Sequence, residues 1–298
     1  MRIVVAGASG FLGQAWREHL ARQGHDVVRL VREEAVSANE SQWDPYAGHV
    51  DQQVIDSADV VANLAGAPIG HWPWTASYKR TLRDSRTATT RTLADAIARS
   101  SGRPTFLVQN GVAGYGDRGD EVLTEDSATP GDTTTLGRIT LDWQDAAQPA
   151  ADAGARVCIM RTAVVLHKSG GALKPMILQF RAGLGGPIGD GRQYFPTISL
   201  NDWVRAATFL ATTDTCKGVY NLTGPNPTTN AEFTKELGRM LNRPTLIRAP
   251  KWPLRRFLGE LSNELLSSVR LEPARLLADG FVFEQPTLND RLASAMTT

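Results

Sequence analysis

The sequence predicts an α/β protein in which a parallel, doubly wound sheet is joined to a smaller, mostly helical C-terminal lobe. Short apolar runs rich in β-branched residues alternate with longer segments whose apolar residues recur every three or four positions, and the alternation extends to Leu166. Such alternation is typical of strands and helices that build a parallel sheet. After Leu166 the chain becomes rich in glycine and proline, which indicates loops and short elements.

The first predicted elements form a strand–helix–strand unit. RIVVA, residues 2–6, has the composition of a strand buried on both faces. In the segment that follows, Leu12, Trp16 and Leu20 recur every fourth residue, which predicts a helix. DVVRLV, residues 26–31, then predicts the second strand, so the turn between the first strand and the helix lies in a βαβ unit.

That turn reads GASGFLG and has the glycine spacing of a dinucleotide-binding turn. Gly7 allows the tight turn, Gly10 lets the backbone approach a pyrophosphate, and Gly13 lets the helix lie close to the sheet. The helix N-terminus adds unpaired N–H groups and a positive dipole end. The residues of this segment expected to contact the cofactor are Gly7, Ser9, Gly10, Phe11, Leu12 and Gly13.

The residue after the second strand indicates which cofactor is bound. An NAD site usually has an acidic residue there, which accepts a hydrogen bond from the ribose 2′-hydroxyl. Here the residue is Arg32, whose guanidinium suits a 2′-phosphate, so the sequence favours NADP(H). Glu33 follows directly and leaves open the alternative of a ribose acceptor.

Further strands and helices follow the same alternation. The predicted strands are residues 60–63, 105–109, 156–166 and 218–222, and the predicted helices are residues 75–100, 138–153, 204–211 and 230–241. Lys79, Arg83 and Arg86 form a basic row on the helix 75–100. One interpretation is that the row is a face exposed to solvent. The other is that Arg86 contacts a phosphate, because the helix begins near the expected cofactor site.

Composition limits the other classes of function. Thirty-two basic residues against 31 acidic ones give a net charge of +1, which predicts neither a nucleic-acid nor a membrane partner. The five histidines do not cluster and the two cysteines, Cys158 and Cys216, lie far apart, so no metal site is expected. No apolar segment approaches the roughly 20 residues of a membrane span, and no secretory signal is present, which predicts a cytoplasmic protein.

Motifs along the whole chain resemble the nucleoside-diphosphate-sugar epimerase-like family of atypical extended short-chain dehydrogenases/reductases. They are GASGFLG, NLAG (63–66), DSR (84–86), GYGDRGDEVLTEDS (114–127), MRTAVVL (160–166) and FRAGLGGPIGDGRQYFP (180–196). The resemblance implies a Rossmann-type NADP(H) domain over residues 1–166, with the strand 218–222 returning to its sheet. It also implies a substrate lobe over 167–298, which includes a family-specific region at about 248–295.

The resemblance also implies site residues. Besides the glycine turn and Arg32, the expected cofactor contacts are Leu64, Ala65, Arg86, Arg161 and Thr162. On the substrate side, Arg192 is a reasonable clamp for an anionic group, and Tyr194 lies beside it in the sequence. The helix 75–100 is of the kind that pairs subunits in the wider superfamily, so a homodimer is possible.

The usual catalytic residues of that superfamily are missing. Its members use a Ser or Thr and a Tyr-x-x-x-Lys pair, in which the Tyr is the general acid/base. Here Leu136 and Thr140 stand where the Tyr and Lys are expected, and Asn110 stands where the Ser or Thr is expected. Asn110 could polarise a carbonyl group or could be a plain turn residue.

Two further residues are candidates for catalysis. Tyr115 lies in the same loop as Asn110, and Glu125 matches an acidic residue of the family but could equally serve as a helix cap or loop residue. We therefore expect an NADP(H)-dependent oxidoreductase or epimerase-like enzyme that acts on a small polar carbonyl or hydroxyl compound. The alternative is a non-catalytic NADP(H)-binding sensor or scaffold.

Overall fold

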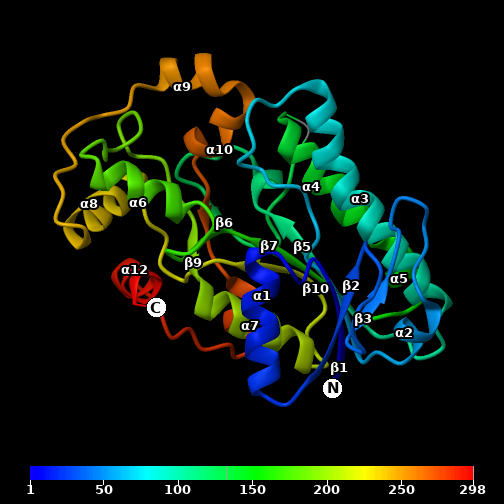
Figure 1. The fold of residues 1–298 in the computed structure, drawn as a ribbon. Helices are drawn as coiled ribbons and strands as arrows, with labels where there is room; N and C mark the ends of the chain where they lie inside the picture. The colour runs from blue at the N-terminus through cyan, green and yellow to red at the C-terminus, as the bar shows by residue number, and fades with distance from the viewer. Residues whose placement is uncertain (132, 298) are drawn as a thin grey trace.

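The computed structural model describes residues 1–131 and 133–297. Its centre is a seven-stranded sheet in the order β10-β7-β5-β4-β1-β2-β3, and all six neighbouring pairs run parallel (Figure 1). The strands are β1 (Arg2–Ala6), β2 (Asp26–Val31), β3 (Glu40–Gln42), β4 (Val60–Asn63), β5 (Thr105–Gly111), β7 (Val157–Thr162) and β10 (Gly218–Leu222). The prediction of a parallel, doubly wound sheet is confirmed.

Helices cover both faces of the sheet. On one face lie α1 (Phe11–Arg22) and α7 (Leu200–Thr212); on the other lie α3 (Ala76–Arg99), α4 (Thr135–Asp145) and α5 (Gln148–Asp152), with α2 (Gln52–Asp56) packed beside α3. Alternate residues of β1 face the two layers. Ile3 and Val5 pack in the core with Trp16 of α1, whereas Val4 and Ala6 pack in the core with Leu93 of α3. This two-sided burial explains why the strand reads as a continuous apolar run.

Several boundaries differ from those expected. The single strand predicted at 156–166 is split into β7 and β8 (Val164–Leu166), because β8 leaves the sheet to pair with β9 (Thr197–Ser199). The single helix predicted at 138–153 is likewise two helices, α4 and α5, and Pro149 lies in the first turn of the second. The edge strand β3 was not predicted, since its sequence ESQ is polar.

The lobe beyond the sheet has a core of its own. Phe180 of α6 (Leu173–Arg181), Phe233 of α8 (Asn230–Met240) and Leu292 of α12 (Leu288–Met296) pack in it together with Phe195. Thr229 and Glu232 form a capping box that begins α8.

The C-terminal chain connects this lobe with the sheet domain. It runs through α9 (Lys251–Leu258), η2 (Gly259–Leu261), α10 (Ser262–Leu266), β11 (Arg270–Leu271) and α11 (Ala274–Ala278). β11 pairs with β6 (Val122–Leu123), which follows the short helix η1 (Ala113–Tyr115). Among the described residues, no helix has the length and apolarity that a membrane crossing requires, and no His/Cys/Asp/Glu group is arranged to hold a metal ion.

Candidate functional site

The glycine turn connects β1 to α1 at the point where the strand order reverses. Gly7 has φ +78°, and a Cβ there would lie 2.6 Å from the carbonyl carbon of Leu64 and from the nitrogen of Ala65, just beyond β4. A Cβ on Gly13 would lie 2.2 Å from the Gly7 oxygen. Both positions therefore require glycine. Because β1 and β4 are neighbours whose connections leave in opposite directions, the turn lies at the topological switch point, where ligands of such sheets bind.

The N-terminus of α1 is free to bind an anion. Gly10 is the N-cap residue, its backbone is extended, and no side chain of the described residues caps the helix. Ser9 and Gly10 are exposed, so the first N–H groups of α1 and the Ser9 hydroxyl are accessible. Leu12 instead packs against the core, and the Phe11 ring lies against Gly170 of the loop after β8, where a Cβ would lie 2.6 Å from the ring.

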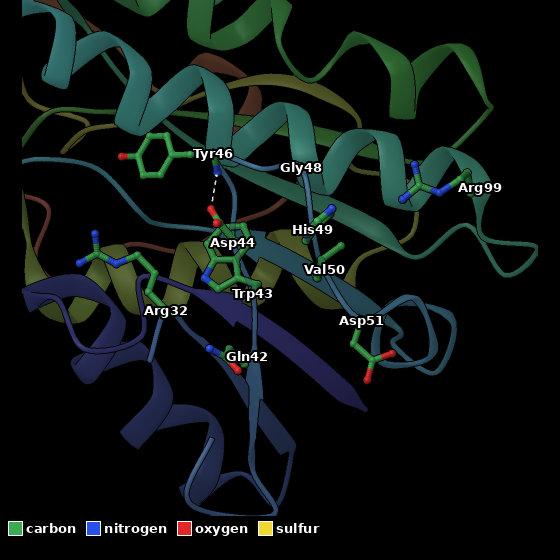
Figure 2. Close-up of a pocket in the computed structure, with 10 residues that line it drawn as sticks. All are labelled: Arg32, Gln42, Trp43, Asp44, Tyr46, Gly48, His49, Val50, Asp51 and Arg99. Atoms are coloured by element: carbon green, nitrogen blue, oxygen red, sulfur yellow. Dashed lines mark hydrogen bonds between the residues drawn. The ribbon is translucent and has the colours of Figure 1, made fainter. Parts of the chain in front are cut away.

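Arg32 lies at one end of a pocket of about 730 Å³ beside β3 (Figure 2). Trp43, Asp44 and Tyr46 line the pocket, and Arg99 lies at its other end. Arg32 is exposed and makes no ion pair with any residue of the two described ranges. Its guanidinium is therefore available to an anionic group. Glu33 is exposed as well.

Arg86 is buried. One of the two interpretations of the basic row on α3, a face exposed to solvent, is therefore wrong for this residue. Its Nη1 donates to the Leu82 oxygen at 2.9 Å and its Nη2 to the Ala67 oxygen at 3.0 Å, while the guanidinium lies 5.2 Å from the centre of the Trp143 ring. Burial lowers the pKa of Arg86 to about 10, so it remains charged at neutral pH. Its contact with Ala67 holds the loop that follows β4.

Asn63 supports the same loop and was missed as a site residue, although it begins the motif NLAG. Its amide is fully buried, and Nδ2 donates to the hydroxyl oxygens of Thr89 and Thr90 at 3.0 and 2.8 Å. Its Oδ1 accepts from the Ala65 nitrogen at 3.1 Å. A buried amide with three hydrogen bonds fixes the backbone of Leu64 and Ala65 against Gly7.

Tyr115 and Glu125 meet in a buried network that also holds Arg161. Arg161 Nη1 donates to the Tyr115 hydroxyl at 2.9 Å, and that hydroxyl donates to Asn221 Oδ1 at 2.8 Å. The Asn221 nitrogen donates to Glu125 Oε1 at 3.0 Å, and the Arg275 nitrogen donates to Glu125 Oε2 at 3.3 Å. Burial raises the pKa of Tyr115 and that of Glu125. The network ties β10 and the C-terminal chain to the loop after β5.

Asn110 is also inside the protein, with 2% of its surface exposed. Its Nδ2 donates to the Thr140 oxygen at 3.0 Å and its Oδ1 accepts from the Gly111 nitrogen at 2.7 Å, so the amide connects β5 with α4. Leu136 packs in an apolar cluster, and the Thr140 hydroxyl donates to the Gly137 oxygen at 2.7 Å. The positions where the Tyr and Lys were expected are thus occupied by packing residues: Leu136 clusters with Leu82 of α3, and Thr140 is bonded to Asn110 of β5.

The remaining predicted residues lie on other elements. Thr162, at the end of β7, accepts a hydrogen bond from Trp203 Nε1 at 3.1 Å and donates one to Gln109 Oε1 at 3.2 Å. Arg192 is exposed in the loop before β9. Tyr194 is half-buried, and the Arg270 guanidinium lies 5.2 Å from the centre of its ring. Tyr194 therefore lies where the lobe meets the C-terminal chain, and Arg192 is two residues before it in the same loop.

A second contact that the sequence did not predict connects the C-terminal chain with the helices of the sheet domain. Glu260, in η2, accepts hydrogen bonds from Lys79 Nζ at 2.5 Å and from the Thr135 hydroxyl. It joins the C-terminal chain to the N-terminal turns of α3 and α4. The partners lie 181 and 125 residues away in the sequence, so no local pattern indicated the contact.

Tyr115→Phe is expected to reduce stability without weakening cofactor binding. The change leaves Arg161 Nη1 and Asn221 Oδ1 without a buried partner, which costs about 1–3 kcal/mol. Urea unfolding measures that loss, and calorimetry with NADPH should give an unchanged Kd. Tyr46→Phe, on an exposed tyrosine, is the control and should change nothing in the unfolding curve. Unchanged stability of Tyr115→Phe would contradict a structural role for this hydroxyl.

Comparisons with known proteins agree with this geometry. Residues 3–223 match the NAD dependent epimerase/dehydratase family, and residues 249–295 match a domain of unknown function, DUF1731. An epimerase family protein of Mycobacterium leprae is 40% identical over 296 residues, which are 99% of this chain and 95% of the relative.

Two solved structures are similar over nearly the whole chain. The crystal structure of human epimerase family protein SDR39U1 with NADPH has a TM-score of 0.91 and 32% identity, and the match covers 100% of both chains. That of a nucleoside-diphosphate sugar epimerase from Corynebacterium glutamicum has a TM-score of 0.81 and 31% identity. This second match covers 99% of this chain and 58% of the other.

Proposed function

The chain belongs to the NAD dependent epimerase/dehydratase family, and on that basis we propose that it binds NADP(H) at the turn between β1 and α1. One observation carries the proposal: Gly7 and Gly13 are packed so closely that neither has room for a side chain. The backbone of the turn is therefore accessible to a ligand, beside the uncapped N-terminus of α1. A bound NADPH in the human relative supports the same ligand class here.

Each part of the site would hold a different part of the cofactor. The N–H groups of the turn and of α1 would bind the pyrophosphate, and Arg32 would bind the 2′-phosphate. The loop with Leu64 and Ala65, held in place by Asn63 and Arg86, would border the middle of the molecule. When bound, the cofactor supplies or accepts a hydride. Arg161 and Thr162, at the carboxyl end of β7, would lie beside the nicotinamide half of the cofactor.

We further propose that the chain is an oxidoreductase or epimerase-like enzyme whose substrate is a small polar carbonyl or hydroxyl compound. Arg192 and Tyr194 would contact that substrate from the lobe. The division into residues 1–166 and 167–298 and the homodimer are parts of the same proposal. Light scattering of the purified protein tests the dimer.

One observation favours a second candidate, a non-catalytic NADP(H)-binding sensor or scaffold. Asn110, Tyr115 and Glu125 are all buried and bonded internally, so none of them presents a proton to a substrate in this conformation. The two candidates differ in turnover. NADPH consumption measured across a panel of small aldehydes, ketones and quinones supports the enzyme, whereas binding of NADPH without consumption of it supports the sensor.

Arg32→Glu tests the cofactor assignment. The exchange replaces a charge-assisted hydrogen-bond donor by a like charge beside the 2′-phosphate, so we expect the Kd for NADPH to rise about 100-fold while that for NADH changes little. Arg99→Glu, at the other end of the same pocket, is the charge-matched control and should leave both Kd values unchanged. An unchanged NADPH affinity in Arg32→Glu would refute the role of Arg32.

A further inference from the structure

The chain between residues 243 and 259 differs from the rest of the protein in charge. It contains five basic residues and no acidic one; the basic residues are Arg243, Arg248, Lys251, Arg255 and Arg256. The other residues contain 27 basic and 31 acidic side chains, a net charge of −4. The near-neutral total therefore conceals a strongly cationic segment, which includes the whole of α9.

The same segment exposes large apolar side chains. The exposed fractions are 87% for Leu246, 54% for Ile247, 72% for Trp252 and 68% for Phe257. None of the residues of α9 is buried, and Figure 1 shows this helix at the periphery, away from the central sheet. Single exposed apolar residues are ordinary on protein surfaces, but four of them within twelve residues are a feature that needs a partner.

Leu184 extends this apolar surface. Its loop runs beside residues 247–249, because the Gly189 nitrogen donates to the Ala249 oxygen at 2.8 Å and the Ala249 nitrogen donates to the Pro187 oxygen at 3.0 Å. Leu184 is 58% exposed. These backbone bonds hold the segment in place at one end, and the Glu260 contacts hold it at the other.

The positive charges of the segment are largely unpaired. Arg248, Arg255 and Arg256 form no ion pair within the part of the chain that the structure describes, and Lys251 lies 3.9 Å from Asp190 in a long contact. Arg243 donates to the Arg181 backbone oxygen rather than to a carboxylate. The cations are therefore available to an external anionic surface.

We propose that residues 243–259 form a docking surface for an anionic lipid bilayer. Aromatic side chains interleaved with Arg and Lys are the composition of segments that lie in the membrane interface, where the rings enter the headgroup region and the cations meet lipid phosphates. No span is involved. The protein would rest on the bilayer through α9 and Leu246–Ile247 while the nucleotide turn stays in water.

Charge complementarity favours this occupant over a second copy of the chain. A symmetric contact through this surface would bring the same five cations of two copies together, and like charges across an interface oppose association. At an anionic bilayer each cation instead adds to binding, by roughly fivefold per Lys or Arg.

Vesicle sedimentation with the full-length protein tests the proposal. We expect binding to vesicles of phosphatidylcholine mixed with phosphatidylglycerol, weak binding to phosphatidylcholine alone, and loss of binding as salt is raised. The double variants Arg255→Glu/Arg256→Glu and Trp252→Ala/Phe257→Ala should each bind at least tenfold more weakly. Val282→Ala is the control, because Val282 is 71% exposed but lies outside the segment. Thermal melts should be alike, since all of these side chains are exposed.

Four results would overturn the proposal. One is the same affinity for both kinds of vesicle, and another is undiminished binding by Arg255→Glu/Arg256→Glu. The third is a dimer that Trp252→Ala/Phe257→Ala converts to a monomer, which would assign the surface to a second copy. A single-stranded oligonucleotide that displaces the vesicles at equal salt would assign it to nucleic acid instead.

Discussion

Gly7→Ala is expected to abolish measurable NADPH binding and to lower the free energy of unfolding by about 2–5 kcal/mol. Two effects add. The residue has φ +78°, which an L side chain rarely adopts, and its new Cβ would lie 2.6 Å from backbone atoms of Leu64 and Ala65. The obstructing atoms belong to backbone, not to a flexible side chain. They are also held in place, because the Leu64 nitrogen donates to the Ala6 oxygen at 2.9 Å.

Gly24→Ala is the matched control for this prediction. Gly24 has φ +77°, almost the same as Gly7, but no atom of residues 1–131 or 133–297 that could obstruct it lies within 4 Å of the position its Cβ would take. Gly24→Ala should therefore lower the free energy of unfolding only by the backbone strain, about 1 kcal/mol, and leave the NADPH affinity unchanged. Urea unfolding and calorimetry measure both quantities. If Gly7→Ala behaved like Gly24→Ala in both, the turn would not be a closely packed cofactor site.

The parts of the fold that the sequence predicted correctly are those determined by local patterns. RIVVA reads as a buried strand because both of its faces meet helices, and the turn after it is contiguous in the sequence. The errors occur where pairing with residues far away in the sequence determines the structure. The run 156–166 is largely apolar and was expected to be one strand, yet β8 pairs with β9 outside the main sheet. The polar β3 is a strand because it pairs with the edge of β2.

The same distinction applies to the site. The glycine turn could be assigned from adjacent residues, whereas the surroundings of Tyr115 depend on Arg161 and Asn221, which are 46 and 106 residues away. Arg86 lies inside the protein, bonded to two backbone oxygens, and not on a solvated face; its contact with a phosphate stays a prediction. The total charge likewise conceals the segment 243–259, because charges far apart in the chain cancel in the sum.

Glu260 and Glu264 are four residues apart and have opposite electrostatic surroundings. Hydrogen bonds from Lys79 and Thr135 lower the pKa of Glu260, whereas burial alone raises the pKa of Glu264 to about 7. Among the described residues, no charge or hydrogen bond offsets the effect of burial on the pKa of Glu264. The two carboxyl groups should therefore affect stability in opposite directions as the pH changes.

For Glu264, stability should fall as the pH rises from 4.5 through about 7, because the unfolded chain releases this proton before the folded protein does. Glu264→Gln removes that loss. Above about pH 7 the variant should therefore be more stable than the original protein by at most about 3 kcal/mol, and near pH 4.5 the two should be equally stable. Urea unfolding across this range measures the difference.

Glu260→Gln is the counterpart, and its effect should have the opposite sign. A lowered pKa gives stability that is present above pH 4.5 and is lost as the pH falls through the folded value. The variant should therefore be less stable at neutral pH, by less than about 1 kcal/mol, because the side chain is 44% exposed and water screens the pair. Opposite changes in stability at two positions four residues apart could not result from a general loss of packing. A Glu264→Gln protein that was destabilised equally at every pH would show that this side chain acts through packing and not through its proton.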